Sequence, residues 1–433
     1  MSRLVHVVGA GLAGLAAAVQ LQRRGARVVL HEAAPHAGGR CRSYFDIKLK
    51  ATIDNGNHVV LSGNHATLAY LKAIGAGDEL VGPTQPELPF VDLLTNARWT
   101  VRLSAGRMPA WIFDSTSRVP GTQPADYLSL ARLLFARPGR TIAQTLRASG
   151  RLWDALAQPL FLATLNVDPR EGSAALAGNL LKETLLLGGQ ACRPLVVRNG
   201  LGPTFIDPAL RLLQHGGAQI RLGTPVHEIG FEEAHSHPAN ARVSSLAFDA
   251  QNAGNAERIA LAPDDGVVLA VSPDAARRLV PGLIAPNRFS AIVNAHFAID
   301  PPLAFEPLTV LLNGTAQWLF AVDGRLSVTI NGAERLLDLP REELAKTLWL
   351  EVAKATKLPA EPMPAWQIVM DKRATFAAFP AQENLRPAAR THWSNLMLAG
   401  DWTATGLPPS VEGAIRSGQK AADLLMNPSV DRR

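Results

Sequence analysis

Three glycines near the start of the chain have the spacing of a phosphate-binding loop. The segment Gly9-Ala10-Gly11-Leu12-Ala13-Gly14 joins the apolar run 4–8 to the alanine- and leucine-rich segment 12–24, which predicts a strand, a tight turn and a helix. Glycine lets the backbone approach a pyrophosphate, and the N–H groups that begin a helix attract its negative charge. We therefore predict that a dinucleotide contacts Gly9, Gly11, Ala13 and Gly14.

An acidic residue and a basic residue follow this loop at positions that suit the same ligand. Glu32 ends a second apolar run, 27–31, where a carboxylate accepts hydrogen bonds from ribose hydroxyls and favours FAD or NAD over NADP. The triplet Gly38-Gly39-Arg40 then supplies a planar guanidinium, which suits a pyrophosphate or a flavin edge. The predicted cofactor contacts here are Glu32, Ala33, Gly39 and Arg40.

The last forty residues favour FAD. An apolar run leads into Gly400-Asp401, and Asp401 is placed to accept from ribityl hydroxyls. A helix beginning near residue 410 puts Val411 and Glu412 at its N-terminus, where the helix dipole stabilises an anionic reduced flavin. This segment contains no cysteine, so we expect non-covalent FAD. The two cysteines, Cys41 and Cys192, have no metal-ligand spacing, and we predict no metal site.

Positioning these residues requires a domain made from separate parts of the chain. A length of 433 residues favours two domains, and the motifs lie at the beginning, middle and end. We predict an α/β fold in which a Rossmann-type FAD-binding domain is assembled from 1–76, 200–285 and 391–433. An α+β substrate domain is inserted, with a helical part over 77–199 and a sheet part over 286–390.

Composition narrows the possible partners. Hydrophobic residues make up 47% of the chain and its formal net charge is +6. The basic residues form no dense run, which argues against nucleic acid, while the charge suits an anionic membrane surface. No apolar run reaches the roughly 18 residues that span a bilayer. Two cysteines fit a reducing compartment, so a cytoplasmic protein is expected.

The order of these motifs resembles the amine oxidase and phytoene desaturase superfamily of flavoproteins. That resemblance implies that Val226 touches adenine through its backbone, and that Gly56 and Asn57 pass by the flavin ring. The segments 54–58, 317–320 and 400–408 look more narrowly like hydroxysqualene dehydroxylases. The implied activity is reductive removal of an allylic hydroxyl from hydroxysqualene, giving squalene in hopanoid synthesis by hydride transfer from the flavin N5.

The expected catalytic residues are His58 and Asn57, which follow the Asp54-x-Gly56 turn. His58 titrates near neutrality and is the candidate proton donor. The apolar isoprenoid substrate requires a long apolar lining. For it we name Trp318, Phe320 and Phe161, although plain core packing explains each of them as well.

Alternatives remain open at this point. A carotenoid-type desaturase or saturase uses the same fold, and redox direction is not readable from the residues. The related Rab escort and dissociation-inhibitor proteins are non-catalytic prenyl-lipid carriers on this fold. The electron donor is unknown because no second dinucleotide loop is visible.

The solubility of the substrate points to a membrane surface. A triterpene alcohol resides in the bilayer, so we expect peripheral association with the inner face of the membrane. The candidate docking elements are residues 109–113, containing Trp111-Ile112-Phe113, and the arginine-flanked helix 127–137.

Overall fold

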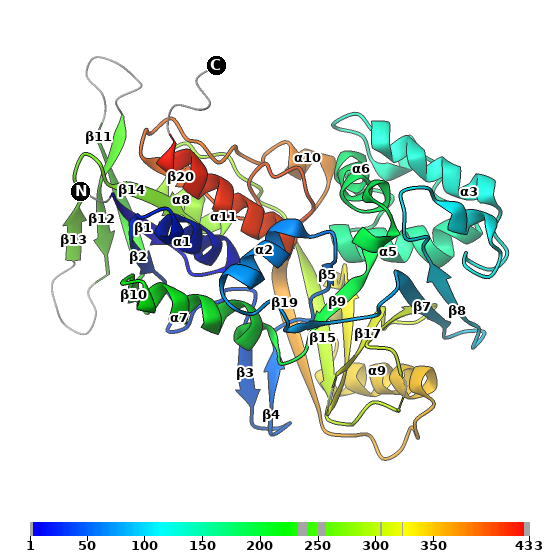
Figure 1. The fold of residues 1–433 in the computed structure, drawn as a ribbon. Coiled ribbons are helices and arrows are strands. Elements are labelled where there is room, and N and C mark those ends of the chain that lie inside the picture. The colour runs from blue at the N-terminus through cyan, green and yellow to red at the C-terminus, as the bar shows by residue number, and fades with distance from the viewer. Residues whose placement is uncertain (1–2, 233–240, 250–256, 304, 323, 428–433) are drawn as a thin grey trace.

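A computed structural model describes residues 3–232, 241–249, 257–303, 305–322 and 324–427 of the chain. Within these ranges two sheets organise the molecule, one at the nucleotide motifs and one beneath a group of helices (Figure 1). None of the helices in the described ranges is both long and apolar enough to cross a bilayer.

The first sheet has five strands, and all of its pairings are parallel. Each of the three predicted FAD-binding segments contributes to it, which is the arrangement that the sequence predicted. The parallel order brings the carboxyl ends of the strands, where the motifs lie, to one edge. In sheet order the strands are β10 (Gln219–Arg221), β2 (Arg27–His31), β1 (Leu4–Val8), β14 (Gly266–Leu269) and β20 (Leu396–Leu398).

Two helices that begin at the motifs pack against each other on this sheet. They are α1 (Leu12–Arg23) and α11 (Val411–Met426) (Figure 1). A Cβ atom added at Gly418 would lie 2.0 Å from the carbonyl oxygen of Ala13, so the close approach of the two backbones requires glycine at this position. The remaining helices of this half are α2 (His65–Ala73), α7 (Asp207–His215) and α8 (Pro273–Leu279).

The second sheet has seven strands and draws them from both predicted substrate segments. Segment 77–199 was expected to be helical, but it also provides two strands of this sheet and two shorter strands. The sequence did not indicate these strands because their alternation of apolar residues is short and their pairing partners lie far away in sequence. In sheet order the strands are β19 (Trp366–Phe376), β15 (Phe289–Phe297), β18 (Arg325–Asn331), β17 (Trp318–Val322), β16 (Leu308–Leu312), β7 (Glu87–Asp92) and β8 (Arg98–Arg102).

Different layers cover the two faces of this sheet. Helix α9 (Arg341–Thr356) packs on one face, where Val293, Leu319 and Val328 meet Trp349. On the other face, Trp318 and its neighbours form an apolar cluster with residues of the helical cap. The cap comprises α3 (Pro124–Leu128), the 3-10 helix Ser129–Phe135, α4 (Ile142–Thr145), α5 (Gln158–Leu165) and α6 (Ala174–Glu183).

The smaller elements connect the two halves. The hairpin of β3 (Ser43–Asp46) and β4 (Ala51–Asp54) joins the Gly39-Arg40 loop to the turn at Gly56 (Figure 1). The others are β5 (Val60–Leu61), β6 (Leu80–Val81), β9 (Pro194–Val197), β11 (Val226–Glu232), β12 (Arg242–Phe248), β13 (Glu257–Ala260) and α10 (Pro380–Glu383).

Candidate active site

In the loop between β1 and α1, Gly9 and Gly14 are packed tightly against neighbouring backbone, whereas Gly11 faces free space. A Cβ atom at Gly9, whose φ is +105°, would lie 2.5 Å from the carbonyl oxygen of Ala270. One at Gly14 would lie 1.8 Å from the carbonyl oxygen of Gly9, but one at Gly11 would meet nothing within 4 Å. The loop therefore leaves free space at Gly11, beside Ala13 in the first turn of α1, as a bound pyrophosphate requires.

Glu32 lies next to this loop at the end of β2. Its Oε2 accepts a hydrogen bond of 2.7 Å from the N–H of Ala10, and its Oε1 accepts one of 2.8 Å from the N–H of Ala34. The intervening Ala33 is exposed, and Glu32 is partly exposed. Each carboxylate oxygen keeps lone pairs beyond the bonds described, which suits the predicted contact with ribose.

Val226 begins the strand β11 close to the same acid. The N–H of Thr224, two residues earlier, donates to the carbonyl oxygen of Glu32 at 2.8 Å. Val226 itself pairs with Phe248 at the edge of β12. The backbone of Val226 thus lies near the Glu32 end of the site, where the resemblance places adenine.

Arg40 joins the first and last motifs of the chain. Gly39 lies against Gly11, since a Cβ atom at Gly39 would be 3.5 Å from the Cα of Gly11. The Arg40 side chain donates to Asp401 Oδ1 at 2.6 Å and to the carbonyl oxygen of Ala374 at 2.8 Å. The pairing with Asp401 raises the pKa of Arg40 above its usual value. Both groups expected to contact FAD therefore also orient each other.

The start of α11 presents free backbone donors. Ser410 caps the helix, and its Oγ accepts from the N–H of Gly413 at 3.1 Å. Within the described ranges, the N–H groups of Val411 and Glu412 donate to no other residue. Gly400 in the neighbouring turn has a φ of +141°. An electronegative ligand edge fits these free N–H groups.

Glu412 was predicted to lie at the cofactor as part of the N-terminus of α11, and its side chain has other partners. Its carboxylate is buried and accepts hydrogen bonds from the N–H groups of Ala66 and Thr67, from the Thr67 hydroxyl and from Arg416. It therefore joins the first turn of α2 to α11. The carboxylate is occupied by the start of α2 and by Arg416, so the backbone N–H of Glu412 is the group that can face the cofactor.

The turn after β4 is held by a buried carboxylate. Asp54 Oδ1 accepts from the Ser43 hydroxyl at 2.5 Å and from the N–H of Leu201 at 2.9 Å. Gly56 follows, and a Cβ atom there would lie 3.4 Å from the Asn294 amide nitrogen. Asp54 thus ties the end of β4, just before this turn, to Ser43 of β3 and to the backbone at Leu201.

The two predicted catalytic residues differ in their surroundings. Asn57 donates through Nδ2 to the Thr329 hydroxyl at 3.0 Å and also reaches Asn294 Oδ1 at 3.5 Å. Burial lowers the pKa of His58, Arg40 lowers it further, and Asp54 and a hydrogen bond to the Arg40 backbone oppose this shift. His58 is therefore neutral at pH 7 and supports the Arg40 loop. Its role as a proton donor stays a prediction.

Arg386 is a residue that sequence reasoning missed. It is 7% exposed, and its guanidinium donates to the carbonyl oxygens of Asp401, Thr403 and Leu407, each at 2.9 Å. One buried cation thus fixes the whole turn between β20 and α11. No local signal marks it, because a single arginine before a proline has no distinctive spacing.

The predicted substrate residues fall into two groups. Trp318 and Phe320 lie in one buried cluster on the cap-facing side of the second sheet. Phe161 belongs to a different cluster, and its ring centroid lies 6.5 Å from that of Trp153. Its neighbour Leu160 packs against the Trp318 cluster instead. The structure therefore does not place Phe161 with the other two, because the helical rotation of α5 turns it away.

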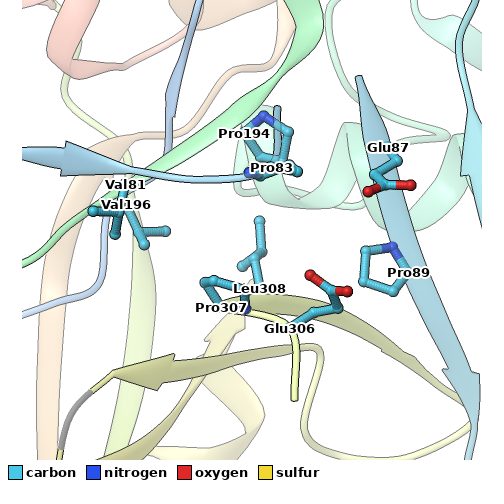
Figure 2. Close-up of a pocket in the computed structure, with 9 residues that line it drawn as sticks. All are labelled: Val81, Pro83, Glu87, Pro89, Pro194, Val196, Glu306, Pro307 and Leu308. Carbon is cyan, nitrogen blue, oxygen red and sulfur yellow. The ribbon is translucent and has the colours of Figure 1, made fainter. Parts of the chain in front are cut away.

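A pocket lies at the edge of the Trp318 cluster (Figure 2). It runs from the exposed Glu306 to the buried Leu308, which pairs with Phe320 across β16 and β17. Four prolines contribute to its wall. None of its lining residues is a predicted FAD contact, so the pocket belongs to the apolar cluster and not to the nucleotide site.

The predicted docking segment 109–113 is mostly buried. Trp111 and Ile112 are 9% and 3% exposed and pack in the Trp318 cluster, with the Trp111 ring edge-on to Tyr127 at 5.0 Å. Only Phe113 projects, at 72% exposed. The expectation that all three residues form a docking surface was wrong, because the apolar pair fills the space between cap and sheet.

The open space at Gly11, the acid at Glu32 and the free N–H groups of α11 together fit an elongated dinucleotide whose far end is a flavin. Comparison with known proteins agrees. The model of a family described as flavin containing amine oxidoreductase matches residues 12–426. A solved putrescine oxidase has the same fold, with a TM-score of 0.70 at 17% identity over 98% of this chain and 99% of the other.

The chain therefore belongs to the flavin-containing amine oxidoreductase family, as an FAD-dependent oxidoreductase. Within it, a protein of Rhodopseudomonas palustris named hydroxysqualene dehydroxylase is 51% identical over 98% of this chain and 99% of its own length. One of the same name from Sinorhizobium fredii is 48% identical over 99% of both chains. The chain is thus a member of the hydroxysqualene dehydroxylase group, and the predicted fold class and cofactor are confirmed.

Proposed function

We propose that the protein removes the allylic hydroxyl of hydroxysqualene to form squalene in hopanoid or triterpene synthesis. The observation that carries this proposal is end-to-end similarity to the two dehydroxylases, which reaches 51% identity over 98% of the chain. The apolar cluster around Trp318 and Phe320 adds a surface of the right chemistry for a polyisoprenoid.

Reduced FAD supplies the hydride that replaces the hydroxyl. In the overall reaction a C–O bond breaks, a C–H bond forms, the oxygen leaves with a proton as water, and the flavin becomes oxidised. The work of this chain is to bind the cofactor through the Gly9–Gly14 loop, Glu32 and the start of α11, and to keep water from the allylic centre. Arg40 and Asp401 fix the two loops that flank the cofactor.

The lowered pKa of His58 determines the pH range in which this residue can donate a proton. Because burial lowers its pKa, His58 carries a proton for transfer chiefly at acidic pH. We keep His58 as the candidate donor, and we expect the reaction rate to fall as pH rises through its lowered pKa. Replacement by Gln, which retains a donor N–H but does not titrate, tests this: a pH profile identical to that of the native enzyme would remove His58 from the reaction.

The test of the proposed reaction is anaerobic. The purified holoenzyme is reduced chemically with dithionite and mixed with hydroxysqualene in detergent, and products are separated by gas chromatography. We expect squalene in an amount equal to the flavin reoxidised. A parallel arm supplies oxidised enzyme with phytoene. Desaturated product in that arm without squalene in the first would favour the carotenoid alternative, and a colourless protein that binds both lipids unchanged would favour a carrier.

We further propose that the protein associates peripherally with the inner, anionic face of the membrane through the cap. Large apolar side chains project from the cap at Leu128 and Phe135, and from the adjacent 3-10 helix Ala110–Phe113 at Phe113; they are 64%, 84% and 72% exposed. Residues 127–153 contain five arginines and no acidic residue. Apolar side chains among exposed cations suit an anionic bilayer surface. These exposed arginines are Arg132, Arg137, Arg140, Arg147 and Arg151.

Liposome flotation tests the membrane association. The double variant Phe113→Asp, Phe135→Asp should lose binding to vesicles of phosphatidylglycerol and phosphatidylcholine, because two charges then face the acyl region. Ile284, which is 66% exposed in the other half of the molecule, offers a matched control through Ile284→Asp. Equal binding by the double variant and the control would end this proposal.

A further inference from the structure

The cap-facing side of the second sheet changes from polar to apolar along a single row of paired residues. Asn294 of β15 pairs with Thr329 of β18, and Thr329 pairs with Trp318 of β17. Trp318 pairs with Val310 of β16, which pairs with Phe90 of β7. Directly paired residues point their side chains to the same face of a sheet. The row therefore runs from an amide and a hydroxyl into an apolar surface.

The next row repeats this change. His296 pairs with Ser327, Ser327 with Phe320, and Phe320 with Leu308. His296 and Ser327 are buried and hydrogen-bonded to each other at 2.8 Å. The boundary between polar and apolar side chains lies in both rows between β18 and β17, so it is a property of the face and not of one residue.

The polar end of the first row holds Asn57 in one orientation. Thr329 donates to Asn294 Oδ1 at 2.7 Å, which leaves the Thr329 oxygen to accept from Asn57 Nδ2 at 3.0 Å. The Asn57 amide nitrogen is thus directed at the sheet. Its Oδ1 accepts from none of the residues that the structure describes, and Asn57 is partly exposed. A fixed amide with a free carbonyl oxygen is an acceptor for a hydroxyl proton.

The apolar side of the boundary contains an unpaired donor. The indole Nε1–H of Trp318 is buried and has no hydrogen-bond partner within the described ranges. A buried N–H without a partner costs free energy, about 1–3 kcal/mol, and a bound water or ligand is one way in which a native protein satisfies such a group. Trp318 lies directly across from Thr329, so the residue that carries the unpaired donor is the strand neighbour of a residue that holds Asn57.

We propose that this boundary recognises the single hydroxyl of an otherwise apolar isoprenoid alcohol. In this arrangement Asn57 Oδ1 accepts the hydroxyl proton and the Trp318 N–H donates to the hydroxyl oxygen. Asn294 and Thr329 are positioning residues for Asn57, and the hydrocarbon extends from the hydroxyl along the apolar side of the boundary, beginning at Trp318. The inference rests on the proposed function, and it identifies the group that separates alcohol from hydrocarbon product.

The location of Asn57 connects this recognition to the cofactor. Asn55, two residues before Asn57, donates through Nδ2 to the Arg40 carbonyl oxygen at 3.0 Å, and Arg40 pairs with Asp401 in the turn before α11. A hydroxyl held by Asn57 is therefore held beside the residues that flank the flavin. After the reaction squalene offers nothing to either Asn57 or Trp318, so the site favours release of the product.

The experiment measures discrimination between alcohol and hydrocarbon. Oxidised holoenzyme is titrated with hydroxysqualene and with squalene in the same detergent, and binding is followed by the change in flavin absorbance. We expect the native protein to prefer the alcohol. Thr329→Val, Asn57→Leu and Trp318→Phe should each reduce that preference by about five- to tenfold, with affinity for squalene unchanged.

Two controls carry the same chemical changes on the side of the sheet that faces α9, one in the sheet and one in α9 itself. Thr309 pairs with Leu319 toward α9, and the Trp349 indole N–H is already bonded to the carbonyl oxygen of Ala360. Thr309→Val and Trp349→Phe should keep the native preference. Retained preference in all three site variants would overturn the inference, and so would an equal loss of affinity for both lipids, because the residues would then only shape the pocket.

Failure of the proposed function gives a different result. If the reduced native enzyme forms no squalene but still prefers the alcohol in the titration, hydroxyl recognition stands and the reaction is wrong. If squalene forms and Thr329→Val discriminates like the native protein, the reaction stands and this recognition site is wrong.

Discussion

The guanidinium of Arg40 lies 2.6 Å from the carboxylate of Asp401, although the two residues are 361 positions apart in the sequence. Their exposures differ sharply, since 48% of the Arg40 side chain but only 5% of the Asp401 side chain is accessible. The pair joins the loop after β2 to the turn after β20. Removing the charge of Arg40 and removing that of Asp401 should therefore have different effects on the stability of the protein.

Arg40→Met should destabilise the apoprotein more than Asp401→Asn. The first change leaves a buried carboxylate without its cation, which costs about 3 kcal/mol, whereas the second leaves a half-exposed guanidinium in contact with water, at about 1 kcal/mol. Urea unfolding of the apoproteins measures both. Equal losses would mean that solvent reaches Asp401 as readily as Arg40.

Gly11→Ala and Gly14→Ala should separate cofactor binding from folding. A Cβ atom at Gly14 would lie 1.8 Å from a backbone oxygen, so Gly14→Ala should cost the apoprotein about 3 kcal/mol. Gly11→Ala meets no protein atom within 4 Å, so apoprotein stability should stay within about 0.5 kcal/mol. Its FAD affinity should fall at least about tenfold by crowding the pyrophosphate. Equilibrium dialysis against FAD tests the second claim, and normal affinity in Gly11→Ala would place the phosphates elsewhere.

Glu412→Gln should act on stability and leave the direct cofactor contacts intact. The carboxylate accepts from Ala66, Thr67 and Arg416, and an amide NH₂ facing those donors costs about 2–3 kcal/mol. Thermal unfolding of the apoprotein measures the loss, with Thr67→Val as a milder companion that removes one donor. A large drop in FAD affinity without loss of stability would instead show that this side chain contacts the cofactor directly.

The buried histidines of the nucleotide sheet should make the protein acid-sensitive. Burial, followed by His6 and Arg221, lowers the pKa of His31 from 6.5 to about 3, and His6 Nδ1 lies 3.0 Å from His31 Nε2. The folded state keeps His31 neutral, while the unfolded chain binds a proton below pH 6.5. Its stabilising effect is therefore present above pH 6.5 and is lost as pH falls, by about 1.4 kcal/mol per pH unit.

Urea midpoints between pH 7 and pH 5 measure this slope. His31→Leu removes one titrating group, so its stability should fall less steeply with acid than that of the native protein, whatever its stability at pH 7. His215, which is exposed on α7, is the control position through His215→Gln, and should leave the slope unchanged. Parallel slopes for the native protein and His31→Leu would contradict a neutral buried His31.

The local spacing of residues was sufficient to predict the strand–turn–helix conformation of the first loop and the position of Glu32 beside it. Gly9, Gly14 and Glu32 act within a strand–turn–helix unit of about thirty residues, and short-range backbone rules describe such a unit fully. The assembly of the FAD domain from three segments also followed from motif order. These predictions depend on contacts close in sequence or on the order of elements.

Side-chain assignments that depend on long-range packing were less predictable. Glu412 bonds to Ala66 and Thr67, 346 and 345 residues away, and its position at the start of a helix gave no sign of these partners. Trp111 looked like a docking residue because its apolar neighbours gave no sign of what they pack on. The hydrogen bonds of Arg386 depend on tertiary structure, and the pairing of Thr329 with Trp318 depends on strand register. A single sequence specifies neither.

The junction of Arg40 with Asp401 also bears on biosynthesis. A ribosome produces the phosphate loop, Glu32 and Arg40 first, and Asp401 is joined to the chain only 361 residues after Arg40. Chain growth of about 5–20 residues per second puts tens of seconds between the two events. A nascent chain therefore exposes an incomplete nucleotide half throughout that interval, and FAD capture becomes a late, essentially post-translational step that cells starved of flavin would leave unfinished.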